Sequence, residues 1–482
     1  MRLVRCAREK LASFFEGYAY PILVCLMVLI GHMTGYEFYI NILGCCLFVL
    51  ALTVSDSLRP MIPFALTFVY QVSVKNTPCS PVLSDYYFTG PRLIIVICLA
   101  ALLLFGFVFY IAKTGLLGRI GFKNTPLLLP LLCLSAVFLL NGLGADKYTP
   151  MNLLFGGIQV FSFFLFFVLM YHGLERENPK ELFSYFCYIT TLISLLLIAE
   201  VVLMFLRGDI ISEEGQIVKD NIFIGWGVCT TIGTVLSVLI PLNFYRAIQG
   251  KFALFHFLVA TALFAAVILT MSRNALLFGG IAYLCCLIIS CVYGKNQKAF
   301  RVGSLLLLIG AIVGFVLFRE DIMRLLSDYF ERGFMDNGRF VIWRNAMWAF
   351  RKNPIFGAGF FIEALELLSN YGISLFPVMV HNTPIQFLAS TGVVGLIVYA
   401  LYRIMTLRPF FRHPSLEKSF LGIAILMFLA ECLLDVFAFM IYPLFYYNIA
   451  LIIALLLSKE DEALAEQNKL SALEKTKRIT KK

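Results

Sequence analysis

Charged residues are scarce in this sequence. Asp, Glu, Lys and Arg make up 14% of its 482 residues, whereas hydrophobic residues make up 60% and the mean hydropathy is +0.87. A soluble globular domain has about a quarter charged residues, so the composition excludes a water-soluble protein. It also excludes disordered and collagen-like chains, because those contain few apolar side chains.

Disulfide and metal-site patterns are also missing. All of the 13 cysteines except Cys6 and Cys79 lie inside or beside apolar stretches, where cysteine acts as a small hydrophobic residue. Their spacing gives neither a disulfide framework nor a zinc site. The sequence has no recognisable internal repeat, which counts against a transporter, because many transporters are built from repeats.

What the sequence does contain is a series of apolar runs close to the ~20 residues that a helix needs to cross a bilayer. They predict an all-α fold, a polytopic membrane helix bundle of about 12–14 transmembrane helices. The first run follows a basic stretch without a small-residue cleavage site, so we expect it to be retained as a helix. The runs are 20–33, 38–54, 61–74, 93–112, 127–140, 153–171, 183–206, 222–245, 252–270, 275–293, 302–318, 384–401, 420–437 and 444–457.

The cations indicate how these helices are oriented. Most of the 39 Lys and Arg residues lie in alternate short connections and at the two ends of the chain. By the positive-inside rule this predicts that both termini are cytoplasmic. The net charge of +10 is therefore explained by membrane topology, and we expect the lipid bilayer, and no nucleic acid, as its partner.

The runs divide the chain into four parts. Residues 1–318 contain the first eleven predicted transmembrane helices, 319–383 form an extracytoplasmic loop, 384–457 contain the last three helices, and 458–482 form a charged cytoplasmic tail. Loops of this length are usually functional. Within the loop, residues 320–352 predict two amphipathic helices with a break at 333–338, and Asp336 or Asn337 is available to cap the second helix.

Two arginine-containing motifs are predicted to face the outside of the membrane. Arg273 lies in a tight turn between two runs, where it can bind an anion or extend to lipid headgroups. In the loop, a spacing of 100° per residue places Arg339 and Trp343 on one face of the second amphipathic helix. The opposite face carries Arg344, Trp348, Arg351 and Lys352, for which contact with headgroups is the alternative to a ligand.

A histidine and a carboxylate complete the candidate site. His381 stands where the loop returns to the membrane, and histidine can accept a proton from a hydroxyl group at neutral pH. A carboxylate inside a membrane-spanning helix costs free energy, so we expect it to have a structural or functional role. Glu431 and Asp435, spaced i and i+4 on one predicted helix, could orient His381, balance an arginine, or bond to another helix. Gly357 and Gly359 would let the backbone turn sharply or approach a ligand.

Taken in order, these motifs resemble the O-antigen ligase and polymerase superfamily of bacterial membrane glycosyltransferases. The resemblance is carried by Ser272-Arg273, Gly338-Arg339 with Trp343, Gly357-x-Gly359, His381-Asn382 and Gly392-x-x-Gly395. It implies a helical bundle in the bacterial inner membrane, with an extracytoplasmic loop that covers a lateral cavity. It also implies transfer of a glycan from a polyprenyl diphosphate carrier to an acceptor hydroxyl, with no metal and no cofactor.

The resemblance also implies roles for individual residues. Arg273 and Arg339 would bind the diphosphate, with Arg344 as a further candidate. His381 would be the catalytic base, and Asp435 matches an acidic residue of the family's later helices. The supporting residues would be Trp343, Asn382, Gly357 and Gly359.

Several functions remain open at this point. An inverting polymerase, which joins lipid-linked repeat units of a surface polysaccharide, is the leading hypothesis, ahead of a ligase that transfers the glycan to lipid A core. A flippase for lipid-linked oligosaccharides and a scaffold protein of an envelope assembly complex are also compatible with a polytopic, basic chain. Expected partners are the lipid-linked donor and a glycan or lipid-linked acceptor, with a separate flippase and a chain-length regulator as further candidates.

Overall fold

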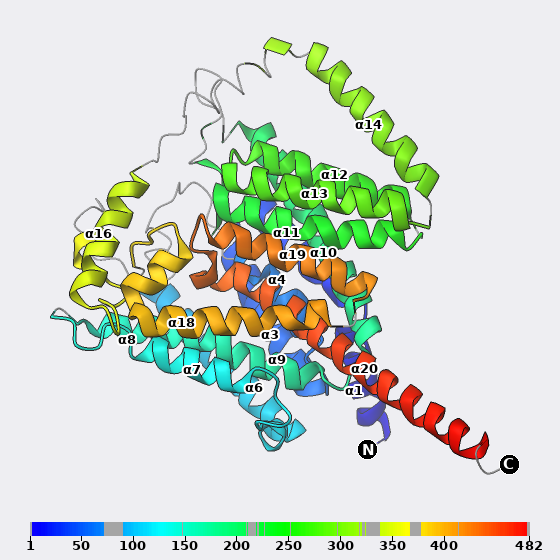
Figure 1. Cartoon of the computed structure of the whole chain (residues 1–482), viewed down its shortest axis with the longest axis horizontal. Helices are drawn as coiled ribbons and strands as arrows, with labels where there is room; N and C mark the ends of the chain where they lie inside the picture. Colours follow the sequence, from blue (N-terminus) through cyan, green and yellow to red (C-terminus); the bar gives the residue numbers. More distant parts are fainter. Residues whose placement is uncertain are drawn as a thin grey trace.

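The structure is a computed structural model that describes residues 2–71, 90–146, 148–208, 210, 218, 221–225, 227–250, 252–295, 297–317, 319–320, 323, 338–366, 377–412 and 414–479. Within these residues the fold is all-α apart from one short hairpin, which confirms the predicted fold class. In the hairpin, β1 (Phe223–Ile224) pairs antiparallel with β2 (Gly227–Val228). Figure 1 shows most helices running side by side, with both termini near the same end of the bundle.

Nine helices of the described chain are long and apolar enough to cross a membrane, or ten if the bent pair α1 (Arg2–Glu16) and α2 (Ala19–Thr34) counts as one span. A π-helical turn, η2 (Phe161–Leu165), joins α8 and α9 into one span. The nine are α3 (Glu37–Val54), α6 (Gly90–Thr114), α8 and α9 (Pro150–Val160 and Phe166–Leu174), α10 (Pro179–Arg207), α11 (Cys229–Ile248), α13 (Arg273–Tyr293), α14 (Gln297–Leu317), α18 (Thr383–Phe411) and α20 (Ile441–Ile479).

Four shorter helices account for the remaining predicted runs. They are α4 (Met61–Gln71), α7 (Leu128–Leu139), α12 (Ala253–Leu269) and α19 (Leu416–Cys432). Every one of the fourteen apolar runs therefore contains a helix, because a continuous apolar stretch can bury its backbone in lipid only with its hydrogen bonds made internally. Short elements complete the chain: η1 (Leu116–Arg119), α16 (Arg339–Lys352), α17 (Glu363–Glu366) and η4 (Phe437–Phe439).

The helix boundaries differ from the prediction in three places. Run 222–245 begins as the β-hairpin and becomes helical only at Cys229. Run 420–437 ends as a helix at Cys432 and is followed by a turn and η4. Run 444–457 lies inside a longer helix, α20, which continues without a break to Ile479. Most of the first amphipathic helix predicted in the loop lies outside the described residues.

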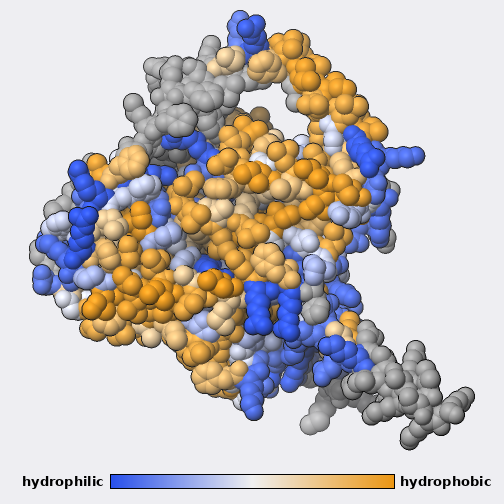
Figure 2. Space-filling model, in the orientation of Figure 1, coloured by the Kyte–Doolittle hydropathy of each residue, from blue (hydrophilic) through white to orange (hydrophobic). Residues whose placement is uncertain are grey.

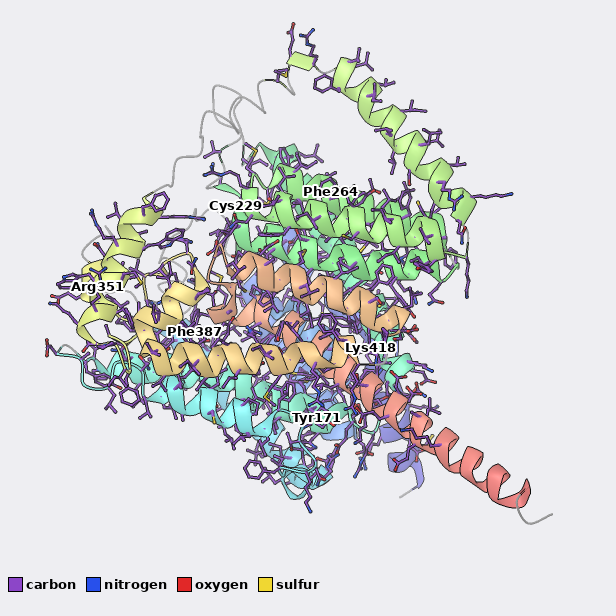
Figure 3. All side chains as sticks on the ribbon, viewed as in Figure 1. Tyr171, Cys229, Phe264, Arg351, Phe387 and Lys418 are labelled. Carbon is purple, nitrogen blue, oxygen red and sulfur yellow. The ribbon has the colours of Figure 1, made fainter. Side chains whose placement is uncertain are left out.

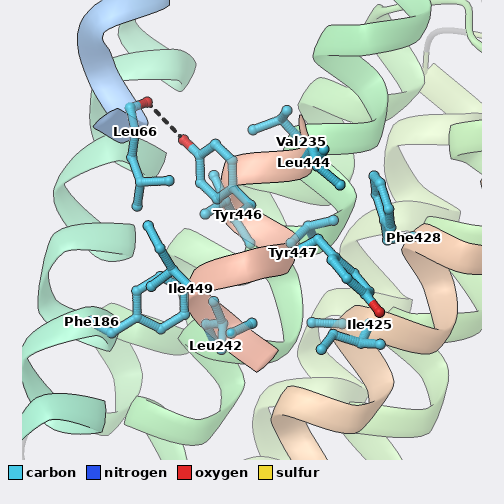
Figure 4. Close-up of a cluster of buried hydrophobic side chains, with 14 of the residues drawn as sticks. Leu66, Phe186, Val235, Leu242, Ile425, Phe428, Leu444, Tyr446, Tyr447 and Ile449 are labelled. Carbon is cyan, nitrogen blue, oxygen red and sulfur yellow. Dashed lines mark hydrogen bonds between the residues drawn. The ribbon is translucent and has the colours of Figure 1, made fainter. Parts of the chain in front are cut away.

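The centre of the bundle is built around α11, whose apolar window is 94% buried. Figure 4 shows side chains of α4, α10, α11 and α19 packed around the first turns of α20. There the Tyr446 hydroxyl donates a hydrogen bond to the Leu66 carbonyl at 3.2 Å. By contrast, α14 has only 6% of its window buried and stands apart from the bundle in Figure 1.

The surface has the distribution expected of a membrane protein. Figure 2 shows an apolar band over the middle of the molecule, with hydrophilic residues collected toward the ends. The end that lies away from both termini carries α16, which runs across the direction of α11, α13 and α18 (Figure 1). We call this end the site end, because it holds the predicted site residues.

Candidate active site at the site end

The predicted site segments meet at one turn, residues 433–436, directly after α19. Its backbone carbonyls accept hydrogen bonds from three separate parts of the chain. The Leu433 carbonyl accepts from Asn382 Nδ2 at 2.8 Å. The Leu434 carbonyl accepts from Asn274 Nδ2 at 3.3 Å and from Arg339 Nη1 at 3.1 Å. The starts of α13, α16 and α18 are therefore brought together by a single turn.

The same turn carries the carboxylate that contacts His381. Asp435 Oδ1 lies 3.0 Å from His381 Nδ1 and also accepts the backbone N–H of Val436 at 2.8 Å. The Asp435 side chain is 2% exposed and that of His381 is 44% exposed. A carboxylate can only accept, so the proton of a neutral His381 is on Nδ1 and the lone pair is on Nε2. This is the tautomer that a base needs.

The backbone around His381 is fixed on both sides. His381 has φ of 53°, a left-handed conformation that non-glycine residues seldom adopt and that often occurs at functional sites. Asn382 follows as the N-cap of α18, and its side chain accepts the N–H of Ile385 at 2.9 Å. Thr383 then donates to the Asp435 carbonyl through both its backbone N–H (3.1 Å) and its hydroxyl (2.8 Å).

Arg273 is the first residue of α13 and its side chain is exposed. Ser272 caps this helix by accepting the N–H of Ala275. The N-terminus of a helix carries a partial positive charge and favours a bound anion. Because Asn274 binds the Leu434 carbonyl, the same carbonyl that accepts from Arg339, the starts of α13 and α16 are close in space.

Arg339 is likewise the first residue of its helix, α16. The N-cap is Gly338 with φ of 77°, without a side-chain cap, so the prediction of Asp336 or Asn337 as the cap is wrong. Trp343, one turn later, donates its indole N–H to the Val380 carbonyl at 2.8 Å. Val380 precedes His381, so Trp343 supports the backbone that carries the histidine.

Arg344 lies on a different face of α16. The face toward the bundle is marked by the buried Ala346 and Ala349, and at 100° per residue Arg344 is nearly opposite to them. Arg344 is exposed, and none of the contacts described links it to the 433–436 turn. Binding of the diphosphate by Arg344 stays a prediction. Arg344 lies on the outward face of α16, whereas Arg339 contacts the 433–436 turn.

Gly357 and Gly359 make close contacts with protein backbone and side chains. Both have positive φ, 72° and 86°. A Cβ on Gly357 would lie 2.3 Å from the Ser390 carbonyl carbon, and one on Gly359 would lie 2.6 Å from the Asn152 amide. The N–H of Gly359 donates to the Ser390 carbonyl at 3.0 Å. These glycines therefore let the segment after α16 pack against α18 where that helix is broken at Gly392.

The comparison with known families fits this arrangement. Residues 257–400 match the model of a family described as O-antigen ligase. The match is confined to this segment of the chain, and it supports a relationship to the O-antigen ligase and polymerase superfamily. Together with the nine apolar helices of the described chain, the match indicates a multi-pass membrane protein and supports an enzyme of the glycosyltransferase type in polysaccharide biosynthesis. No curated protein matches the sequence.

The matched segment contains Arg273, Arg339 and His381, whereas Asp435 lies beyond it. Asp435 was predicted from its place in an apolar run, but its helical pairing with Glu431 is wrong, because α19 ends at Cys432. Glu431 is instead buried in the helix and hydrogen-bonded to Thr234 of α11.

No role was assigned to Asn274 or Thr383 from the sequence. Both are polar residues next to ones that were singled out, Arg273 and Asn382, and both donate to carbonyls of the 433–436 turn. The only signal in the sequence for these two residues was that each follows a residue already identified as a candidate.

Proposed function

We propose that this protein is a repeat-unit polymerase: it transfers a glycan from a polyprenyl diphosphate to the hydroxyl of another lipid-linked unit, by inversion and without a metal. The observation that carries the proposal is the His381–Asp435 contact at 3.0 Å, in the same turn that holds Arg339 and Asn274. A positioned base close to the starts of two helices that each begin with an arginine fits transfer from a diphosphate. A flippase would not need the base.

Arg273 and Arg339 supply the positive charge for the donor. A guanidinium can form forked hydrogen bonds to a phosphate and keeps its charge at any physiological pH. Each arginine stands at a helix N-terminus, where the partial charge of the helix adds to its own. Negative charge that develops on the leaving diphosphate is thereby stabilised by groups already in place.

The lipid-facing side of α13 supports a polyprenyl donor. An apolar pocket of about 400 Å³ lies between α12, α13 and α14, and its lining includes Gly280, Leu284 and Leu287. These residues follow Arg273 at steps of 7, 11 and 14, so all four share one stripe of the helix. At 1.5 Å per residue the pocket begins ~10 Å and ends ~21 Å below Arg273. A chain attached to a diphosphate at Arg273 would reach it directly.

The reaction follows from this geometry as a single displacement. The acceptor hydroxyl oxygen attacks the anomeric carbon, and its proton passes to Nε2 of His381. The bond between the anomeric carbon and the diphosphate oxygen breaks, and both electrons leave with the diphosphate, held by Arg273 and Arg339. Asp435 keeps the ring in position and stabilises the imidazolium that forms. His381 then releases the proton to water.

Replacement of His381 tests the base. We expect His381→Asn to lower transfer by about 10²- to 10⁴-fold, the usual contribution of a general base. Asparagine tolerates the left-handed backbone of this position better than alanine does, so the membrane level should be unchanged. The assay is transfer between purified lipid-linked units in proteoliposomes. Turnover close to that of the parent would remove His381 from the mechanism.

A ligase is the second candidate, because the matched family is described by that activity. A deletion strain separates the two. If single repeat units accumulate on the lipid carrier and long chains vanish, the acceptor is another lipid-linked unit and the protein is a polymerase. If long chains persist on the carrier and fail to reach the surface anchor, the protein is a ligase.

A further inference from the structure

We propose that the outward face of α16, formed by Arg344, Trp348, Arg351 and Lys352, binds an acidic saccharide chain as it extends from the site. This inference rests on the proposed function and adds a second contact region for the same substrate. The chemical class is a glycan that bears carboxylate or phosphate groups.

The first argument is where this face points. Ala346 and Ala349 of α16 are buried in a small cluster with Val380 and Ala389, which fixes the inward side of the helix. Arg344, Arg351 and Lys352 are exposed on the other side, and Trp348 is 51% exposed. Figure 3 shows Arg351 at the extremity of the site end, pointing away from the bundle.

The second argument is the chemistry of the face. Helix α16 has four cationic residues and no acidic one in its sequence RFVIWRNAMWAFRK. Within the described residues, none of the ion pairs involves Arg344, Arg351 or Lys352. Lys352 Nζ lies 3.7 Å from the centre of the Trp348 ring. Because Lys352 covers one face of the ring, a sugar can stack only on the other face. The guanidinium groups can form forked bonds to the acidic substituents of the sugar.

The third argument separates a glycan from lipid. Residues that bind headgroups form a belt around the sides of the transmembrane helices. Helix α16 instead runs across the direction of those helices at the site end (Figure 1), and Arg351 of its outward face lies at that extremity (Figure 3). A chain that leaves the site along the bundle axis meets this face, whereas the lipid around the bundle does not.

The fourth argument is distance along the helix. Arg339, at the start of α16, is bound at the 433–436 turn. Arg344 and Arg351 follow it by five and twelve residues, which is ~8 and ~18 Å of helix. A glycan attached to a diphosphate at Arg339 thus passes over the outward face only after several sugar residues. The face would act on long chains more than on single units.

Chain extension provides the first test. In Arg351→Gln/Lys352→Gln, we expect the ratio of later transfers to the first transfer to fall about tenfold, since two exposed charge contacts are lost. Products of the strain should be correspondingly shorter on a gel. The matched control is Arg176→Gln/Arg207→Gln, which removes two exposed arginines from other parts of the surface and should leave the ratio unchanged. An unchanged ratio in the α16 variant overturns the inference, whereas absence of the first transfer in the parent protein overturns the proposed function.

Direct binding provides the second test, which does not depend on turnover. The purified full chain is titrated with oligomers of galacturonate, with dextran oligomers of equal length, and with vesicles containing phosphatidylglycerol. We expect galacturonate to bind, with an affinity that falls with salt and is about tenfold weaker in the α16 variant. Trp348→Ala should weaken it as well. Equal binding of dextran, or a loss in the variant confined to the vesicles, overturns the inference.

Discussion

Replacement of Asp435 by asparagine gives the sharpest test of how the base is held. The substitution keeps the size of the side chain and removes its charge. Asp435 Oδ1 accepts from both His381 Nδ1 and the Val436 N–H, and the side chain is 2% exposed. If the amide oxygen remains toward His381, the hydrogen bond survives without its charge. If the amide nitrogen turns there, it forces the lone pair to Nδ1 and the proton to Nε2, which disables the base.

The magnitude follows from the lost interaction. A hydrogen bond to a charged group contributes about 1.5–3 kcal/mol, and each 1.36 kcal/mol in the barrier changes the rate tenfold. We therefore expect Asp435→Asn to reduce turnover by about 10- to 150-fold, with the KM for the lipid-linked donor nearly unchanged.

The assay is transfer in proteoliposomes, run beside Glu181→Gln, which makes the same change at an exposed carboxylate of α10. Thermal unfolding in detergent shows whether the fold is intact. Turnover of Asp435→Asn within twofold of the parent, with His381→Asn inactive, would refute the orienting role of Asp435.

Two further outcomes follow from the arginine and glycine positions. Arg273→Lys should raise the KM for the donor about tenfold, because lysine cannot make a forked contact. The control Arg207→Lys should leave this KM unchanged. A donor KM of Arg273→Lys equal to that of the parent would exclude a forked contact at Arg273. Gly357→Ala should lower the free energy of unfolding by about 1–3 kcal/mol, the cost of a left-handed backbone at a non-glycine residue, with the added Cβ 2.3 Å from Ser390. Gly118→Ala, whose Cβ would meet nothing within 4 Å, is its control, and equal melting temperatures in detergent would contradict the packing role of Gly357.

Most of the helical architecture could be predicted because apolar run length is a direct physical signal. In lipid, a run such as 302–318 must satisfy its backbone hydrogen bonds internally, and a helix does so. Helix α14 forms there although only 6% of its apolar window is buried against the rest of the protein. Helix ends are set by local hydrogen bonds instead. Little in the run 420–437 shows that the helix stops at Cys432, since the residues beyond it are equally apolar apart from Asp435.

The site was predicted in part for a similar reason. Arg273, His381 and Asp435 are polar or charged residues within or next to apolar runs, where burial costs free energy, so they can be recognised in a sequence. Arg339 was recognised from its motif in the loop. The backbone carbonyls of Leu433 and Leu434 that bring their segments together are invisible, because every residue has a carbonyl. The position of Arg344 depends on which side of α16 packs against the bundle. Helical periodicity separates the two faces of α16, but it does not show which of them faces the bundle.

The length of α20 has a mechanical consequence. Its 39 residues make a rod of ~58 Å that starts six residues after Asp435 and continues beyond the opposite end of the bundle (Figure 1). The rod contains no glycine, and its single proline, Pro443, is in the first turn, so it has no hinge. A rotation or axial shift imposed on its far end would therefore be carried along the helix to Ile441, six residues from Asp435.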